Sequence, residues 1–340
     1  MSDLMEFIID DGVLVKYNGN CQTVIIPEGV SVIGKWSFSN CRNLESIDIP
    51  NGVISIGQGA FSGCENLASI TISESLTHIG DLAFERCKSI KSIKVAENNP
   101  IYRDIDGNLY NKQGTALLKY CVGKNDTVFD IPNGISTLPR KAFYMCKSLL
   151  QVTIPNGVTE IPQCAFEGCT NLRKITLPDS ITAIDWCAFL DCENLTDVML
   201  PYGLIRLSAS AFAGCKSLTS ITIPRGITEI EKGVFSNCYN LVNVSIMGDV
   251  TIIGDYAFYA CKQLGNIILS GSITLIGDEA FKNCKKANVF CSTSHIDLKK
   301  VKIQKGNSDL KKAPFYFYTE EKPSTIGNFW HYENGEIVVW

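Results

Sequence analysis

The sequence predicts a curved, right-handed, β-rich solenoid of ten or more 23-residue repeats, with a parallel concave sheet and short helical or 3₁₀ turns. Two observations support this fold class. A Phe followed three residues later by a Cys recurs with a step of 23 residues. A short stretch of alternating apolar and polar residues accompanies each copy, as in a strand with one buried face. The ten matching Phe residues are Phe38, Phe61, Phe84, Phe143, Phe166, Phe189, Phe212, Phe235, Phe258 and Phe281.

A single repeat explains why the copies must stack. Ile70 and Ile72 alternate with polar residues, which predicts a strand, and the proline that commonly follows ends the strand because it lacks an amide donor. The stretch Ala165-Phe166-x-x-Cys169 spans about one helical turn and directs Phe and Cys to the same interior. A unit this short cannot bury its apolar face alone. Stacked copies are therefore expected to form a parallel sheet with ~4.8 Å between strands.

The repeats are interrupted once, between Phe84 and Phe143. We interpret the intervening segment, from Asn99 to Tyr120, as two strands joined by turns, and a related pattern at the N-terminus predicts a cap hairpin. The insertion is expected to be embedded in the array and not to mark a domain boundary. The expected organisation is a cap hairpin and first strand (1–30), repeats (31–95), an embedded hairpin insertion (96–132), repeats (133–295), and a Lys-rich segment with an aromatic cap (296–340).

Composition narrows the class of protein. The net charge of −4 does not favour a nucleic-acid backbone as partner, and no stretch approaches the ~18 consecutive apolar residues of a membrane span. Fifteen cysteines, an odd number, exclude a fully paired disulfide framework within one chain. The acidic segment from Met1 to Val15 lacks the apolar core of a signal peptide. The sequence as written thus predicts a cytoplasmic monomer, or a cell-surface or secreted protein if the chain has been trimmed.

The repeat unit resembles a known family. The pattern Asn-Leu-x-x-Ile-x-Ile-Pro-x-Gly-Val-x-x-Ile-Gly-x-x-Ala-Phe-x-x-Cys is similar to the BspA-type leucine-rich repeat of bacteria, over roughly residues 7 to 290. The resemblance implies a non-enzymatic binding scaffold, since the family is similar to adhesins and binders of bacterial cell surfaces. The tail from Gly327 to Trp340 looks like an ending often attached to such arrays in gut bacteria.

No catalytic, cofactor or metal site is expected. The repeat supplies one Cys per coil, whereas zinc needs four converging ligands, and the motifs of serine hydrolases, P-loops and zinc proteases do not occur. Cys164 and Cys187 lie two residues before their Phe, in a column that elsewhere holds Lys and Glu. We therefore expect both thiols to be exposed on adjacent coils. Incidental pairing and a labile disulfide or reactive pair stay open as alternatives.

Two surfaces are candidates for binding a protein ligand. Curved solenoids commonly bind partners on the concave sheet, so the outward strand residues, here called the strand-face surface, come first. The second is a group of tyrosines on the turn side of neighbouring coils, because clustered exposed aromatics mark contacts. The candidate residues are Ser46, Asp48, Ser69, Thr71, Thr153, Thr176, Asp197, Met199, Thr222, Ser245 and Ile268 on strands, with Met199 and Ile268 as apolar outliers, and Tyr239, Tyr256 and Tyr259 on turns.

The aromatic tail, residues 315–340, has two interpretations. Its eight aromatic residues supply enough apolar surface to seal the last coil, whose open end needs a cap. Alternatively, the tail binds cell-wall glycan, since its Trp-x-Tyr spacing at Trp330 and Tyr332 is similar to that of cell-wall-binding repeats. The cap interpretation predicts that Trp330 and Trp340 are both shielded.

Overall fold

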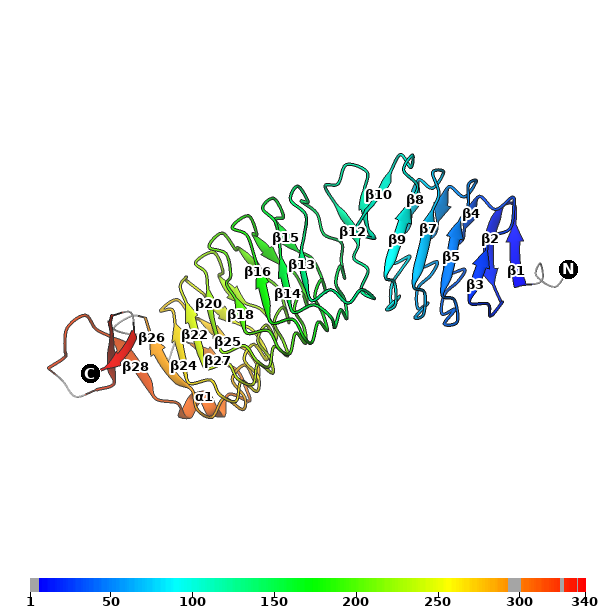
Figure 1. The fold of residues 1–340 in the computed structure, drawn as a ribbon. Helices are drawn as coiled ribbons and strands as arrows, with labels where there is room; N and C mark the ends of the chain where they lie inside the picture. Colours follow the sequence, from blue (N-terminus) through cyan, green and yellow to red (C-terminus); the bar gives the residue numbers. More distant parts are fainter. Residues whose placement is uncertain (1–5, 293–300, 325–326, 335) are drawn as a thin grey trace. The chain divides into compact units, whose positions relative to one another are not determined.

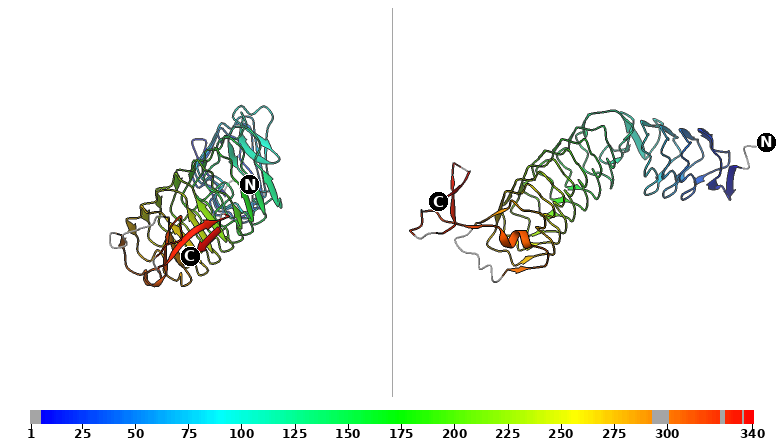
Figure 2. Two further views of the ribbon diagram at one scale, coloured as in Figure 1. Left: turned by 90° about the vertical axis from the view of Figure 1, so that its left-hand side faces the viewer. Right: turned by 90° about the horizontal axis from the view of Figure 1, so that it is seen from below.

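The computed structural model describes residues 6–292, 301–324, 327–334 and 336–340, apart from the side chains of residues 197 and 336. The chain divides into two compact units, residues 1–126 and 127–340. Figures 1 and 2 show coil following coil within each unit. The predicted solenoid of short parallel strands is confirmed, and helix is confined to one short segment of the described residues.

Unit 1 contains three sheets among its described residues. Longer strands pair in the order β3-β5-β7-β9, and short strands pair in the order β2-β4-β6-β8 with β1 antiparallel to β2. The insertion forms the third sheet, β10-β11-β12. The bounds are β1 Phe7–Asp10, β2 Val13–Tyr17, β3 Thr23–Ile25, β4 Val32–Ile33, β5 Ser46–Ile49, β6 Ser55–Ile56, β7 Ser69–Ile72, β8 His78–Ile79, β9 Ser92–Val95, β10 Tyr102–Ile105, β11 Asn108–Asn111 and β12 Leu117–Lys119.

Unit 2 continues the same alternation of long and short strands. The long strands form the sheets β13-β14-β16-β18 and β20-β22-β24-β26-β28-β29-β30, and the short ones form β15-β17-β19 and β21-β23-β25-β27. The bounds are β13 Val128–Asp130, β14 Gln151–Thr153, β15 Glu160–Ile161, β16 Lys174–Thr176, β17 Ala183–Ile184, β18 Asp197–Val198, β19 Arg206–Leu207, β20 Ser220–Ile223, β21 Glu229–Ile230, β22 Asn243–Ile246, β23 Ile252–Ile253, β24 Asn266–Leu269, β25 Leu275–Ile276, β26 Asn288–Cys291, β27 Lys302–Ile303, α1 Ser308–Lys312, β28 Phe315–Tyr318, β29 Phe329–Glu333 and β30 Glu336–Val339.

Equivalent residues of successive coils pair directly, which confirms the columns that the 23-residue period predicts. Ser69, for example, pairs with Ser46 on one side and Ser92 on the other. The inward columns form the core, and the Phe column is buried as expected. Within each unit the neighbouring Phe rings stack nearly parallel, with centroids 4.7 to 5.9 Å apart.

The segment around each Phe is a run of overlapping β-turns, not a regular helix. In this segment the residue at position −2 from the Phe and the residue at position +2 have positive φ. Around Phe166 these residues are Cys164 and Gly168, with φ values of 55° and 72°. The turns pair with the next coil, since the Phe143 N–H donates to the Ala165 carbonyl at 2.7 Å. Backbone hydrogen bonds of this kind make a third ladder along the stack, which the side-chain pattern alone did not reveal.

The cysteine column supplies hydrogen bonds as well as apolar volume. The thiol of Cys192 donates to the carbonyl of Phe166 on the preceding coil at 3.1 Å, and that of Cys215 donates to Phe189 at 3.3 Å. From the sequence this column is predicted only as small and apolar. The same contact recurs for Cys64, Cys87, Cys169, Cys238, Cys261 and Cys284.

The insertion in unit 1 differs from the prediction of two strands, because it forms three antiparallel strands, β10 to β12. A fully buried Asn99 joins it to the coils. Its Nδ2 donates to the carbonyls of Ser73 (2.7 Å) and Leu76 (2.9 Å), and its Oδ1 accepts from the N–H groups of Ile101 (2.9 Å) and Tyr102 (2.8 Å). One side chain thereby meets four main-chain groups that the interrupted repeat would leave unpaired.

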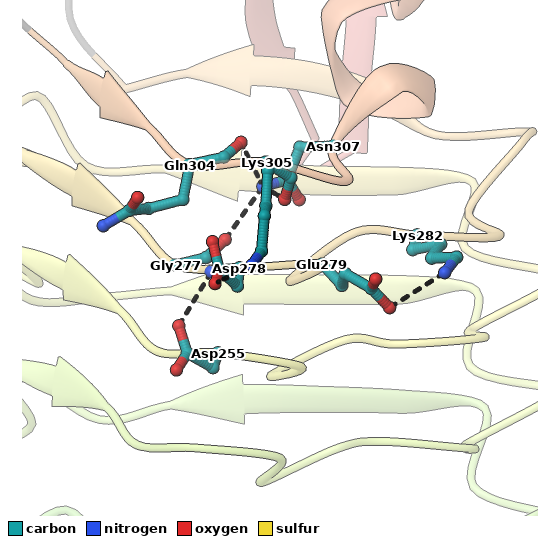
Figure 3. A network of polar contacts seen from close by, with 8 residues as sticks. All are labelled: Asp255, Gly277, Asp278, Glu279, Lys282, Gln304, Lys305 and Asn307. Atoms are coloured by element: carbon teal, nitrogen blue, oxygen red, sulfur yellow. Dashed lines mark hydrogen bonds and ion pairs between the residues drawn. The ribbon is translucent and has the colours of Figure 1, made fainter.

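Side chains replace the missing next coil at the C-terminal end of the turn ladder. The N–H of Phe281, whose equivalents donate to the next coil, donates to Oδ1 of Asn307 at 2.9 Å, and that of Asn283 donates to Oδ2 of Asp309 at 2.8 Å. The Nδ2 of Asn307 donates to the Gly277 carbonyl at 2.8 Å (Figure 3). The segment that starts α1, seen beside the last coils in Figure 2, thus closes this ladder.

Candidate functional site

The predicted strand-face residues lie on the stacked long strands of the two units. Unit 1 carries one group in register on β5 and β7, and unit 2 carries the other on β14, β16, β20, β22 and β24 and after β18. The side chain of Asp197 lies outside the described part of the chain. The side chains that are exposed or partly exposed on this surface are Ser46, Asp48, Ser69, Thr71, Thr153, Thr176, Met199, Thr222 and Ser245.

The two apolar outliers of this surface differ. Met199 is 81% exposed, as expected. The expectation that Ile268 is exposed was wrong, because Ile268 is buried against Phe290 and Trp330. The reason is the tail, which covers this end of the sheet.

The tail extends the long-strand sheet of unit 2. Strand β28 pairs parallel with β26, β29 pairs with β28, and β30 closes the edge antiparallel to β29. Trp330 is 1% exposed, and its Nε1 donates to the Cys291 carbonyl at 3.0 Å. Trp340 stacks on His331 but stays 38% exposed, so the prediction that both tryptophans are shielded was right for Trp330 and wrong for Trp340.

Two exposed residues that sequence reasoning missed follow Met199 closely in the sequence. Tyr202 and Ile205 are 77% and 68% exposed on the same coil, and we name Met199, Tyr202 and Ile205 the apolar ridge. The aligned repeats nevertheless mark Tyr202 and Ile205 as unusual. The repeats on either side hold Asp179 and Arg225 in place of Tyr202, and threonines in place of Ile205. A large apolar residue among polar ones in the same column is therefore the signal that identifies both residues.

The turn-side tyrosines are only partly brought together. The rings of Tyr256 and Tyr259 meet edge to face with centroids 5.9 Å apart, and Tyr256 is the exposed one. Tyr239 instead lies under the ammonium group of Lys262, 4.7 Å from its ring centroid. A second ammonium, that of Lys232, lies 5.8 Å from the Tyr256 ring. Cation–π contacts of this kind place positive charge next to each aromatic surface.

The expectation that Cys164 and Cys187 are exposed was wrong, because both are buried. Side chains in their column lie along the stack, since the Trp36 ring occupies the place where a Cβ on Gly59 of the next coil would be. A short thiol in this column is therefore held between adjacent coils. Burial raises the pKa of the Cys164 thiol to about 12 and that of Cys187 to about 11, and the nearby Glu167 carboxylate adds to both shifts.

Thiol labelling of the native protein tests this arrangement. All fifteen cysteines are free thiols, but only Cys21 is exposed and Cys41 half-buried. The neighbouring Cys64 thiol lowers the pKa of Cys41, whereas burial raises the pKa of Cys238 and of Cys284 to about 12. Because the thiolate reacts and the thiol does not, we expect iodoacetamide at pH 8 to label Cys21 and Cys41 first. Mass spectrometry that finds most of the other cysteines labelled before unfolding contradicts the buried column.

Neither a metal centre nor a membrane span is found where the structure describes the chain. No three His, Cys, Asp or Glu side chains of the described residues converge in the manner of metal ligands. The helix that the structure describes, α1, is too short to cross a bilayer.

The fold and its surfaces define a class of protein. Parallel strands repeat once per 23-residue coil, and the inward columns of Phe, Leu and Ile stack into a continuous buried core within each unit. These are the features of a leucine-rich-repeat solenoid. The chain belongs to the family of the BspA type leucine rich repeat region, whose model matches in six copies at residues 14–113, 114–241 and 188–322.

Solved structures of bacterial proteins share the fold. The pneumococcal vaccine antigen PcpA is 20% identical, with 89% of this chain and 80% of that chain covered and a TM-score of 0.60. A leucine-rich repeat protein from Eubacterium ventriosum is 19% identical, with 96% and 92% covered and a TM-score of 0.54. Identities this low show the fold alone. The comparison with curated protein sequences finds no match.

Proposed function

We propose that the protein is a non-enzymatic scaffold that binds a protein ligand on the strand-face surface, with the apolar ridge of unit 2 at the centre of the contact. The observation that carries the proposal is the exposure of Met199, Tyr202 and Ile205 on one coil. Three large apolar side chains that one coil exposes to water are costly to keep unless a partner covers them.

The surroundings of the ridge fit a protein interface. The neighbouring strands present Thr176 and Thr222, which are small, polar and exposed. An ion pair between Arg206 and Glu160, 3.1 Å apart, lies in the column next to that of Ile205. An apolar centre with a polar, charged rim is the usual composition of a protein contact, and Tyr is enriched among the residues that dominate binding energy.

Glycan binding by the tail is the weaker candidate. This hypothesis requires accessible aromatic side chains on β29 and at the chain end. Trp330 is buried and therefore cannot contact a ligand. Tyr332 and Trp340 stay accessible, so the alternative is tested separately. Sedimentation with purified cell wall that is lost in Tyr332→Ala and Trp340→Ala variants would favour the glycan candidate.

The role of the apolar ridge is tested by comparing the proteins captured from extracts by three forms of the chain: the unchanged chain, a triple variant of the ridge and a control variant. We expect the triple variant Met199→Ser, Tyr202→Ser, Ile205→Ser to weaken capture of the partner by about 30-fold or more, as for a loss of about 2 kcal/mol or more of contact energy. Ile54→Ser is the matched control, because Ile54 occupies the column of Ile205 in unit 1 and is also exposed. A partner captured equally by all three forms would rule the ridge out.

A further inference from the structure

The short strands of unit 1 carry a groove that the strand-face proposal does not use. It has a volume of about 530 Å³ and runs over β4, β6 and β8. The polar side chains that line it come from successive coils and, among the described residues, have no hydrogen-bond or ion-pair partner: Lys35, Ser55, Gln58, His78 and Asp81. The floor is a column of three glycines, Gly34, Gly57 and Gly80.

Main-chain donors are left open in the floor of this groove. Within the described part of the chain, the N–H groups of Lys35 and Gln58 have no hydrogen-bond partner. A Cβ added to Gly57 would lie 2.7 Å from the nitrogen of Lys35, and one added to Gly80 would lie 2.6 Å from that of Gln58. Glycine therefore keeps both donors uncovered, and because they lie on adjacent coils they are ~4.8 Å apart.

Some coils of unit 2 show which chemical group can accept a hydrogen bond from the N–H at the position of Lys35. On two coils of unit 2 a carboxylate of the chain itself bonds the N–H equivalent to that of Lys35: Asp255 Oδ1 accepts from Asp278 at 2.7 Å (Figure 3), and Glu231 Oε2 accepts from Ala209 at 2.8 Å. On a third coil, Asp185 Oδ1 accepts from Trp186 at 2.9 Å. The equivalent N–H groups of Gln163, Lys232 and Asp255 have no hydrogen-bond partner among the described residues. In unit 1 the residues at the two carboxylate-bearing positions are Gly, Lys and Gln, except for Asp81 at the end of the groove.

We propose that the groove of unit 1 binds a carboxylate of a peptide, held by the N–H groups of Lys35 and Gln58 and neutralised by the Lys35 ammonium group. A carboxylate suits these donors because its two oxygens can accept from two neighbouring N–H groups at once, and bonds to an ionised acceptor are the stronger ones. Gln58, Ser55 and His78 add side-chain donors around it. Asp81 disfavours a second negative charge at that end, so a single carboxylate is preferred to a polyanion.

Both sources of a peptide carboxylate, an acidic side chain and a free C-terminus, share this chemistry. The probes are acetyl-Gly-Glu-Gly-amide, its Gln counterpart, and acetyl-Gly-Gly-Gly with a free or an amidated C-terminus, titrated against the full chain by amide NMR. We expect saturable shifts of the Lys35 and Gln58 amide signals with a carboxylate probe and none with its neutral counterpart. The carboxylate probe that binds more tightly identifies the source.

Two variants test whether the Lys35 N–H and the Lys35 ammonium group hold the carboxylate. Gly57→Ala covers the Lys35 N–H and Lys35→Gln removes the ammonium charge without touching the floor; we expect each to weaken binding at least tenfold. Gly254→Ala is the matched control, because its Cβ would meet the Lys232 nitrogen in unit 2 at 2.8 Å, and it should bind as the unchanged chain does. If Gly57→Ala fails to fold, Lys35→Gln still decides. Equal shifts with charged and neutral probes, or unchanged affinity in Lys35→Gln, overturn the proposal.

Discussion

Replacing Phe212 with alanine should lower the free energy of unfolding by about 3–5 kcal/mol. The ring is fully buried and stacks between Phe189 and Phe235, with centroids 5.0 and 5.9 Å away. Its removal leaves a cavity that the coils cannot close, because hydrogen bonds between the turns hold their spacing on both sides, from the Phe189 N–H to the Ala211 carbonyl and from the Phe212 N–H to the Val234 carbonyl. Stability in a solenoid passes between neighbouring coils, so the loss should also weaken the contacts of the coils on either side.

The measurement is equilibrium denaturation followed by fluorescence and circular dichroism, with Cys215→Ala as the control in the same coil. That control removes a smaller side chain and one thiol hydrogen bond to Phe189, and should cost about 1–2 kcal/mol. An unfolding midpoint of Phe212→Ala equal to that of the unchanged chain would show that the Phe column is not the core.

Replacing Asn99 with alanine should cost unit 1 about 3 kcal/mol or more. Four main-chain groups lose their partner at once, at Ser73, Leu76, Ile101 and Tyr102, and a buried group without a partner costs about 1–3 kcal/mol. We expect the insertion to detach from the coils before the coils themselves unfold. Hydrogen exchange should then show faster exchange of the Ile101 and Tyr102 amides.

A second asparagine of the insertion is the control. Asn111 also accepts from two main-chain N–H groups, those of Thr115 and Ala116, but it lies in a more open turn where water can replace it. Asn111→Ala should therefore cost about 1 kcal/mol. Equal losses in the two variants would show that burial of Asn99 is not what makes it important.

Much of the fold was predictable because each column repeats one environment. A Phe at every 23rd position has to stack on its neighbours once the coils pair in register, so the core followed from the period. The candidate binding surface was predicted less completely from the sequence. Met199 was predicted from its column, but Tyr202 and Ile205 were not, because they lie beside the strands and not on them.

Other outcomes depended on backbone geometry that no pattern of residue types displays. Lys, Cys, Tyr and Gly all occupy the column two before Phe, which suggested a tolerant exposed position. The structure shows positive φ throughout that column, with side chains directed along the stack. Cys164 and Cys187 are buried for this reason, although the same column exposes Trp36 and Tyr256.

The sequence by itself determined the repeat, the parallel pairing and the inward columns, because stacked identical units can bury their apolar residues in only one register. The tertiary structure alone decided which outward residues reach solvent. Ile268 and Met199 occupy the same column, yet the tail covers the first and leaves the second 81% exposed. Coverage depends on contacts between segments far apart in sequence, such as the bond from Trp330 to Cys291, and such contacts have no period to be recognised by.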